Sequence, residues 1–167
     1  MLKLRKNKKG FTLVELIVVI AIMAVLAGTV AGVTVSQLNK QTNNSGATQA
    51  KLIADYVIQE IGSDPDNVID TSGTGTAAKT IFKSSGEGAN KVYEIITRIE
   101  ANMKNDKFAW GAGKGQINVE VISSVTDTSV TNKPDDTVKI TYTAKGNGKN
   151  AVYTVTADGQ LTGPTES

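Results

Sequence analysis

The pattern of polar and apolar positions divides the chain into four zones. Residues 1–10 are basic, residues 11–35 are almost wholly apolar, residues 36–61 mix polar residues with an apolar stripe, and residues 62–167 are rich in Gly, Thr and Ser. No charged residue occurs in the 20 positions from Leu16 to Val35. A helix rises about 1.5 Å per residue, so this run would span roughly 30 Å, the thickness of the hydrocarbon core of a bilayer. The second zone is therefore predicted to be a membrane-spanning helix.

The third zone, residues 36–61, has the spacing of an amphipathic helix. One face of that helix would be apolar, and it comprises Leu52, Ile53, Tyr56, Val57 and Ile61. The stretch from Gln41 to Gly46 consists of residues with low helix propensity, which leaves open either a continuous helix or a kink. The sequence from Gly62 to Pro65 is a helix stop signal.

The last zone, residues 62–167, predicts a globular head with one short helix and three strands. The helix is expected at about residues 90–103, with Asn90 as its N-cap. Alternation predicts strands at about 117–124, 137–145 and 151–157, with a turn at Gly146–Gly148 and a further turn at Asp158-Gly159 leading to a short strand at Leu161. All three prolines are expected outside these elements. The predicted fold class is α+β: a long N-terminal helix packed on a small antiparallel sheet, with a short helix in the connecting region.

Composition excludes several kinds of chemistry. The chain has no Cys and no His, so it can form neither a disulfide nor the usual zinc sites, and triads built on His are ruled out. No pair of carboxylates stands out among the 16 acidic residues, and no calcium-loop spacing is present. We therefore predict no enzyme activity, no catalytic residue, no metal site and no cofactor.

Charge is concentrated at the N-terminus. Five of the 18 basic residues lie in the first nine positions: Lys3, Arg5, Lys6, Lys8 and Lys9. Without them the formal balance falls from +2 to −3, so the basic pI is poor support for nucleic-acid binding by the rest of the chain. Basic residues before a membrane span predict that this end stays cytoplasmic and that the bulk of the chain lies outside.

Glu15 is the most informative residue of the apolar zone. A charged side chain near the centre of a membrane helix costs roughly 2.5–3.5 kcal/mol, and less near an end, so this carboxylate calls for a partner. If the chain were cut between Gly10 and Phe11, a new α-ammonium would lie one helical turn away and could pair with a carboxylate of its own or a neighbouring chain. Two alternatives, a secretory signal peptide cut after Ala27 and a plain membrane anchor, leave Glu15 unexplained.

The run Lys8-Lys9-Gly10-Phe11-Thr12-Leu13-Val14-Glu15 resembles the class III leader and helix start of the type IV pilin family. The resemblance covers about residues 1–40. It implies the pilin fold, removal of leader residues 1–10 by a prepilin peptidase, N-methylation of Phe11, and neutralisation of the Phe11 amine of a neighbouring subunit by Glu15. It also implies a subunit that waits in the membrane and is then drawn into a homopolymeric surface filament by an assembly platform and ATPase. The absence of a Cys pair and the long basic leader favour a Gram-positive source, and Glu15 favours a major or bulk pilin.

Gly32 departs from the family pattern, because most members have proline at that position. Gly28 and Gly32 each weaken a helix by about 1 kcal/mol relative to Ala, so they predict local helix flexibility. The same spacing is also typical of membrane helices that pack closely.

Two other features have competing interpretations. The segment from Phe108 to Gly115 mixes aromatics, glycine and a lysine, which suits a ligand or nucleic-acid loop but more often marks a core contact. Asp127, Asp135 and Asp136 are expected in a solvated loop. Three functions remain: a pilus subunit for adhesion, motility or DNA uptake, a pseudopilin of a type II secretion or competence system, and a signal-anchored extracellular enzyme or binding domain.

Overall fold

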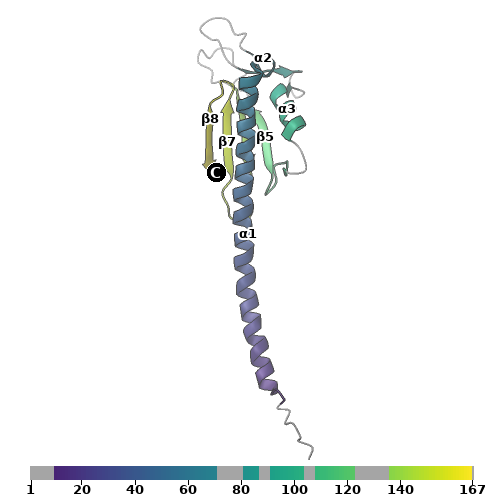
Figure 1. Ribbon diagram of the computed structural model, residues 1–167, viewed down its shortest axis with the longest axis vertical. Helices are drawn as coiled ribbons and strands as arrows, with labels where there is room; N and C mark the ends of the chain where they lie inside the picture. Colours follow the sequence, from purple (N-terminus) through teal and green to yellow (C-terminus); the bar gives the residue numbers. More distant parts are fainter. Residues whose placement is uncertain (1–9, 71–80, 87–90, 104–107, 123–135, 167) are drawn as a thin grey trace, which may run out of the picture. The chain divides into compact units, whose positions relative to one another are not determined.

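The computed structural model describes residues 10–70, 81–86, 91–103, 108–122 and 136–166. The chain forms two compact units, Met1–Leu38 and Asn39–Ser167. The second unit contains the predicted globular part, residues 62–167, together with the C-terminal part of the long helix, and it is called the head from here on. Helix α1 (Leu13–Ser63) contributes to both units and is unbroken along its 51 residues (Figure 1). The stretch from Gln41 to Gly46 is therefore helical, without the break that its composition allowed.

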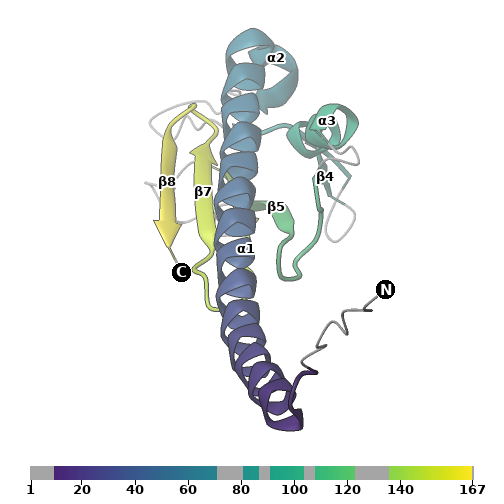
Figure 2. The same ribbon diagram turned by 60° about the horizontal axis from the view of Figure 1, so that its bottom comes forward.

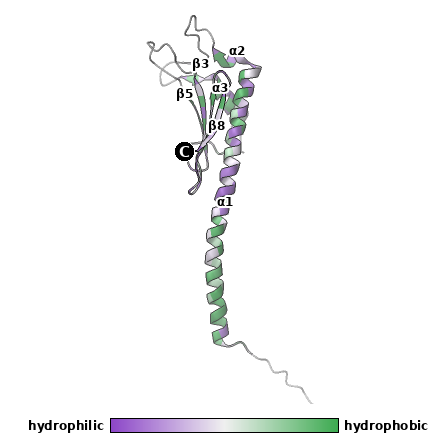
Figure 3. Cartoon of the chain, turned by 90° about the vertical axis from the view of Figure 1, so that its left-hand side faces the viewer, coloured by the Kyte–Doolittle hydropathy of each residue, from purple (hydrophilic) through white to green (hydrophobic). Residues whose placement is uncertain are grey.

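The first unit is the N-terminal part of α1. Its apolar side chains are exposed around the whole circumference, and Figure 3 shows the hydrophobic colour covering this part of the helix. Helix α1 is long enough and apolar enough to cross a membrane, judged by length and composition alone, and it is the one such helix in the described part of the chain. These side chains are left exposed by the residues that the structure describes, so a stable environment for them would come from lipid or from other chains.

The head is built on a sheet with strand order β5-β6-β7-β8, in which every pairing is antiparallel. The strands are β5 (Ile117–Ile122), β6 (Thr137–Tyr142), β7 (Ala151–Thr156) and β8 (Leu161–Glu166) (Figures 1 and 2). Alternate residues of β6 and β7 are buried, and they meet the buried stripe of α1, which comprises Gly46, Ala50, Ile53, Ala54, Val57 and Ile61. The predicted α+β arrangement is confirmed.

Short elements fill the connection between α1 and the sheet. They are α2 (Pro65–Val68), β1 (Ile69–Asp70), β2 (Ile81–Phe82), β3 (Ser84–Ser85), β4 (Val92–Tyr93) and α3 (Glu94–Met103). Helix α3 begins four residues later than predicted, because Val92 and Tyr93 pair with Ser85 and Ser84, and the Glu94 amide donates to the Lys83 carbonyl at 2.9 Å. Asn90, the predicted N-cap, lies outside the described residues.

The C-terminal strand also differs from expectation. Leu161–Glu166 forms a full fourth strand that contains Pro164, whereas all prolines were expected outside the elements. Strand β8 is at the edge of the sheet, where a residue without an amide hydrogen is tolerated. Pro65 begins α2, a position where the missing N–H costs nothing. Pro134 lies outside the described residues.

Two strands end slightly before their predicted ends: β6 ends at Tyr142 and β7 at Thr156, against about 145 and 157. Residues 123–124, the end of the first predicted strand, lie outside the described part. Gly146, in the turn between β6 and β7, has a positive φ of 64°, which favours glycine.

Asp136 corrects one expectation directly. It was placed in a solvated loop, but it is only 4% exposed, and its Oδ2 accepts a hydrogen bond from the Phe82 amide at 3.3 Å. Its carbonyl accepts the Ala157 amide at 2.9 Å. The side chain therefore ties β2 to the start of β6. Asp127 and Asp135 lie outside the described residues.

The stretch of α1 with poor helix propensity is the contact site for the β6–β7 hairpin. The Asn43 side chain accepts the Lys145 amide at 2.8 Å and donates to the Lys145 carbonyl at 3.1 Å. The Tyr142 hydroxyl donates to Asn43 Oδ1 at 3.1 Å, and its ring lies on Gly46, where a Cβ would be 2.0 Å from Tyr142 Cε2. Gly46 and Asn43 weaken the helix locally, and both are used to seat the hairpin.

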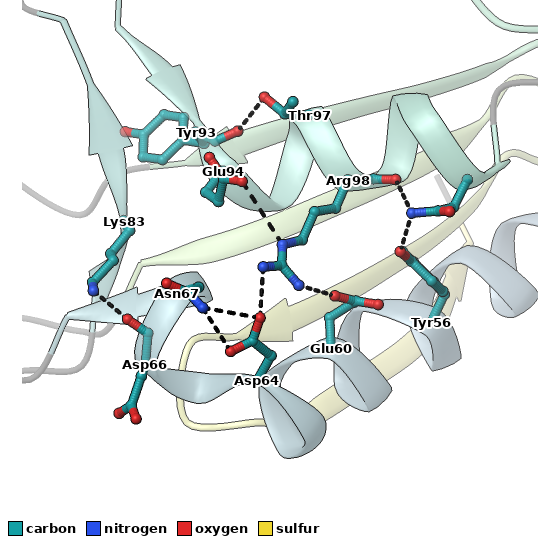
Figure 4. A network of polar contacts seen from close by, with 11 residues as sticks. Tyr56, Glu60, Asp64, Asp66, Asn67, Lys83, Tyr93, Glu94, Thr97 and Arg98 are labelled. Atoms are coloured by element: carbon teal, nitrogen blue, oxygen red, sulfur yellow. Dashed lines mark hydrogen bonds and ion pairs between the residues drawn. The ribbon is translucent and has the colours of Figure 1, made fainter.

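Helix α3 is joined to the end of α1 by Arg98 (Figure 4). Its guanidinium donates to Glu60 Oε2 at 2.6 Å and to Asp64 Oδ2 at 2.7 Å. The two carboxylates raise the pKa of Arg98, which stays charged, and Arg98 lowers the pKa of Asp64 below its usual 3.8. Asn102 adds a hydrogen bond to the Tyr56 hydroxyl at 2.9 Å. Polar contacts thus supplement the apolar contact of Ile95 and Ile99 with the core.

Replacing glycine by alanine inside a helix normally raises stability, but the Gly46 contact predicts that it lowers stability here. We expect Gly46→Ala to destabilise the head by up to about 2 kcal/mol, because overpacking costs about 1–3 kcal/mol and the better helix propensity returns only about 1. Thermal unfolding of the full chain in detergent, followed by near-UV circular dichroism, measures this. Gly62→Ala is the matched control: its Cβ would meet nothing within 4 Å, so stability should stay equal or rise. Equal effects of the two changes would refute the contact.

The Arg98 contacts predict local loosening of α3. Arg98→Met should increase hydrogen exchange of the α3 amides while the β6 and β7 amides stay protected, because Glu60 and Asp64 lose their shared cation. Lys51→Met, which breaks the exposed pair with Asp55, should leave α3 unchanged. The pKa of Asp64 is lower in the folded chain, so its contribution is present above pH 3.8 and is lost as pH falls through the folded value. Loosening of α3 in the wild type should therefore begin only below about pH 3.8.

Candidate functional site at the start of helix α1

The bond between Gly10 and Phe11 precedes the first helical residue, Leu13, and lies in non-helical backbone. Both residues are exposed, and 90% of the Phe11 surface is accessible. This segment therefore offers a peptidase exposed, non-helical backbone immediately before the helix. Leader residues 1–9 lie outside the described part of the chain.

Thr12 and Glu15 form a reciprocal hydrogen-bonded cap at the start of α1. The Thr12 amide donates to Glu15 Oε2 at 2.8 Å, and the Thr12 hydroxyl donates to the same oxygen at 2.9 Å. In return, the Glu15 amide donates to Thr12 Oγ1 at 3.3 Å. This is the capping box of a helix N-terminus, in which the Ser or Thr is followed three residues later by Glu or Gln.

The capping box changes the interpretation of Glu15. Sequence reasoning treated its carboxylate as costly and without a partner, but Thr12 satisfies one of its two oxygens within the chain. The signal was present in the sequence as Thr12-Leu13-Val14-Glu15, directly before an apolar run, and it was missed. A carboxylate in the first turn also interacts favourably with the positive end of the helix dipole.

Gly28 and Gly32 lie within the unbroken part of α1, and a Cβ at either position would meet nothing within 4 Å. Their backbone therefore has the ordinary helical conformation in the isolated chain. Whether they serve flexibility or close packing depends on neighbouring chains, and that assignment stays a prediction. Two nearby threonines bond back to the helix, Thr29 to the Leu26 carbonyl and Thr34 to the Val30 carbonyl.

The aromatic side chains of the segment from Phe108 to Gly115 are core contacts, whereas Ala112, Gly113 and Lys114 are exposed. Trp110 is half-buried, its ring centroid lies 6.1 Å from that of Phe108, and both pack against the core. The backbone around it runs beside β5, with the Ile117 amide donating to the Ala109 carbonyl at 2.7 Å. Among the residues that the structure describes, no group of three or more acidic side chains is arranged to hold a metal.

Comparison with known proteins supports the N-terminal site. The family model described as the prokaryotic N-terminal methylation motif matches residues 5–31. The chain carries a prepilin leader of class III. The match spans residues 5–10 of the leader, the Gly10–Phe11 bond, the capping box and Gly28, and it ends one residue before Gly32. It supports a place in the type IV pilin and pseudopilin class. Neither the curated proteins nor the solved structures gave a match to this chain.

The prepilin motif indicates a structural subunit rather than an enzyme, and it implies processing by a peptidase and anchoring of the precursor in the membrane. The long exposed apolar helix is consistent with this anchoring. Thus the predicted cleavage bond, the predicted methylation site and the capped carboxylate all lie within six consecutive residues, 10–15.

The capping box predicts a local effect of Thr12. We expect Thr12→Val to destabilise the first turn of α1 by about 1 kcal/mol, because the cap loses both bonds made by the hydroxyl. Hydrogen exchange of the amides of residues 13–15, measured on the full chain in detergent, should then rise about fivefold. Thr12→Ser keeps the hydroxyl and should behave as wild type. Unchanged exchange in the valine variant would show that the cap does not hold this turn.

Proposed function

We propose that the chain is the structural subunit of a type IV pilus, cut after Gly10, methylated at the Phe11 amine and polymerised through residues 11–61. Homopolymeric surface filaments would then display residues 62–167 for adhesion, motility or DNA uptake. An assembly platform and ATPase would draw the subunit from the membrane. The observation that carries the proposal is the capped Glu15, located one turn after the cleavage bond at the start of an uncovered apolar helix.

Hydrolysis of the Gly10–Phe11 amide would add water, leaving a carboxylate on Gly10 and an ammonium on Phe11. Thr12 engages only Oε2 of Glu15, and within the described residues Oε1 has no hydrogen-bond donor. The ammonium of a neighbouring subunit could therefore bind Oε1 while the capping box stays formed. Two such charges 4 Å apart attract by about 4 kcal/mol at an effective dielectric constant of about 20. That is enough to favour one helix register over others.

Packing of the helices against each other would also cover the apolar side chains of residues 11–35. Each square ångström of apolar surface removed from water contributes about 25 cal/mol, although transfer from lipid to a protein contact contributes much less. Specific assembly from a membrane therefore depends on polar pairing and close approach more than on hydrophobicity. Glu15 and the glycine pair Gly28 and Gly32 are the features of the helix suited to these two tasks.

The first test is the identity of the mature N-terminus. Intact mass and N-terminal sequencing of the protein from its native host should give methylated Phe11. A terminus near Gly28, or an uncut Met1, would overturn the proposal. Electron microscopy of sheared surface filaments with an antibody to residues 62–167 then separates the pilus from a pseudopilin: long labelled fibres are expected, and their absence with normal processing would favour the secretion or competence role.

The role of Glu15 is tested by Glu15→Gln, which keeps the shape and removes the charge. We expect normal leader cleavage and a filament yield at least about tenfold lower, since a loss of about 1.4 kcal/mol per contact already changes an equilibrium tenfold. Glu120→Gln, which removes an exposed charge paired with Lys139 in the head, is the control and should leave the yield unchanged. Wild-type yield in the Glu15 variant would contradict charge pairing.

A further inference from the structure

Three lysines from separate segments come together at one end of the head. Lys40, Lys114 and Lys145 are all exposed. Lys40 lies three residues before Asn43 on α1, and Asn43 binds the Lys145 backbone at 2.8 Å. The stem of Lys145 lies over Gly115, where a Cβ would be 2.2 Å from Lys145 Cε, and Lys114 is the preceding residue. These three residues are called the lysine patch.

The lysine patch carries an uncompensated charge. The stretches of chain around the three lysines, residues 36–46, 111–117 and 142–150, contain no acidic residue. Lys149, in the same turn as Lys145, is neutralised by Glu166 at 2.6 Å. No ion pair to Lys40, Lys114 or Lys145 occurs within the described ranges. The local charge of +3 contrasts with the balance of −3 left when the five leader charges are removed.

The opposite end of the head has a different charge character. Strand β6 runs from buried Asp136 toward Lys145, and the far end of α1 carries Glu60 and Asp64 in the Arg98 network (Figure 4). Lysines without partners therefore gather where the hairpin turn meets residues 39–43, and carboxylates gather where α1 ends. Because its positive and negative groups are separated in this way, the head is expected to turn the lysine patch toward a negatively charged surface.

Chain connectivity places the lysine patch beside the end of the apolar run. Lys40 follows Val35 by five residues, which corresponds to a rise of about 7–8 Å along a helix. If residues 11–35 span the hydrocarbon core, Lys40 is at the depth of the headgroups or just outside it. The hydrogen bonds of Asn43 hold Lys145 at the same part of α1. The covalent link at Asn39 therefore limits the distance between Lys40 and the end of the apolar run.

We propose that the lysine patch docks the head on anionic phospholipid headgroups of the membrane that anchors residues 11–35. The inference rests on the proposed membrane-anchored subunit, and it adds a lipid contact outside the apolar helix. Each Lys near an anionic surface favours the bound state roughly fivefold, and the effect falls off within a Debye length. Docking would hold the unassembled subunit in a restricted orientation and would be released when the subunit leaves the membrane.

The test uses the mature full chain reconstituted in vesicles. The natural chain has no Cys, so Asn147→Cys in the exposed β6–β7 turn gives a single labelling position beside Lys145. Quenching of a fluorophore at position 147 by headgroup-labelled lipid reports docking. We expect stronger quenching in phosphatidylcholine mixed with phosphatidylglycerol than in phosphatidylcholine alone. Raising salt from about 0.1 M to 1 M shortens the Debye length from about 10 Å to about 3 Å and should remove the difference.

The triple variant K40Q/K114Q/K145Q should lose the dependence on phosphatidylglycerol, with each lysine contributing roughly fivefold to the ratio of docked to free heads. The control K51Q/K91Q/K139Q removes the same charge elsewhere on the head and should behave as wild type. Equal quenching in both lipids, or equal losses in both variants, would overturn the proposal. So would duplex DNA displacing the head from phosphatidylglycerol vesicles through the same three lysines at physiological salt, since the patch would then be a nucleic-acid site.

Failure of this inference and failure of the pilus proposal are distinguishable. Vesicle docking is measured without filament assembly, so a normal methylated Phe11 terminus and long fibres with no lipid dependence would overturn only the docking. Lipid-dependent docking in a chain that forms no fibres would support the docking proposal and overturn only the pilus proposal.

Discussion

The contact of the Tyr142 ring with Gly46 is the constraint on which the arrangement of the head depends. The ring occupies the space that any side chain at position 46 would fill, and its hydroxyl is held by Asn43 and by the Thr42 carbonyl. The β6–β7 hairpin therefore meets α1 at one place along the helix. Once this end is fixed, the buried faces of β6 and β7 align with Ile53 and Val57, and the sheet extends from there by its antiparallel register.

This contact explains why a stretch with poor helix propensity remains helical. Gly and Asn in a helix interior each cost up to about 1 kcal/mol relative to Ala, and the residues from Gln41 to Gly46 sum to several such costs. Tertiary contacts offset them: Asn43 pairs with the Lys145 backbone through both atoms of its amide, as a neighbouring strand would. The same residues that weaken an isolated helix give the head its docking geometry. Helix stability here comes from packing more than from propensity.

Sequence reasoning predicted the elements whose signal is periodic and local. The 3.6-residue stripe from Leu52 to Ile61 and the alternation of Val138, Ile140 and Tyr142 both correspond to observed elements, and the stop at Ser63 follows Gly62. The later start of α3 could not be predicted this way, because Val92 and Tyr93 are held by two serines seven or more positions away in strands of two residues. The burial of Asp136 could not be predicted from its neighbours in sequence, because the amide that it binds belongs to Phe82, 54 positions earlier in the chain. At the functional site, the leader motif was recognised and the capping box was overlooked.

The capping box and the proposed intersubunit pair place two demands on one carboxylate, and the geometry allows both. A Glu15 held only by a distant ammonium would leave the first turn of α1 with unsatisfied amides inside a membrane, where each would be expensive. A Glu15 bound on both oxygens by its own chain would have less capacity for a neighbour. Thr12 donates to a single oxygen from both its backbone and its side chain, so the Thr12 and Glu15 amides are satisfied before cleavage and Oε1 remains for assembly. A glutamine at position 15 would keep one acceptor oxygen for Thr12 and replace the other with a donor amide, which is why charge removal is expected to spare the helix and affect the filament.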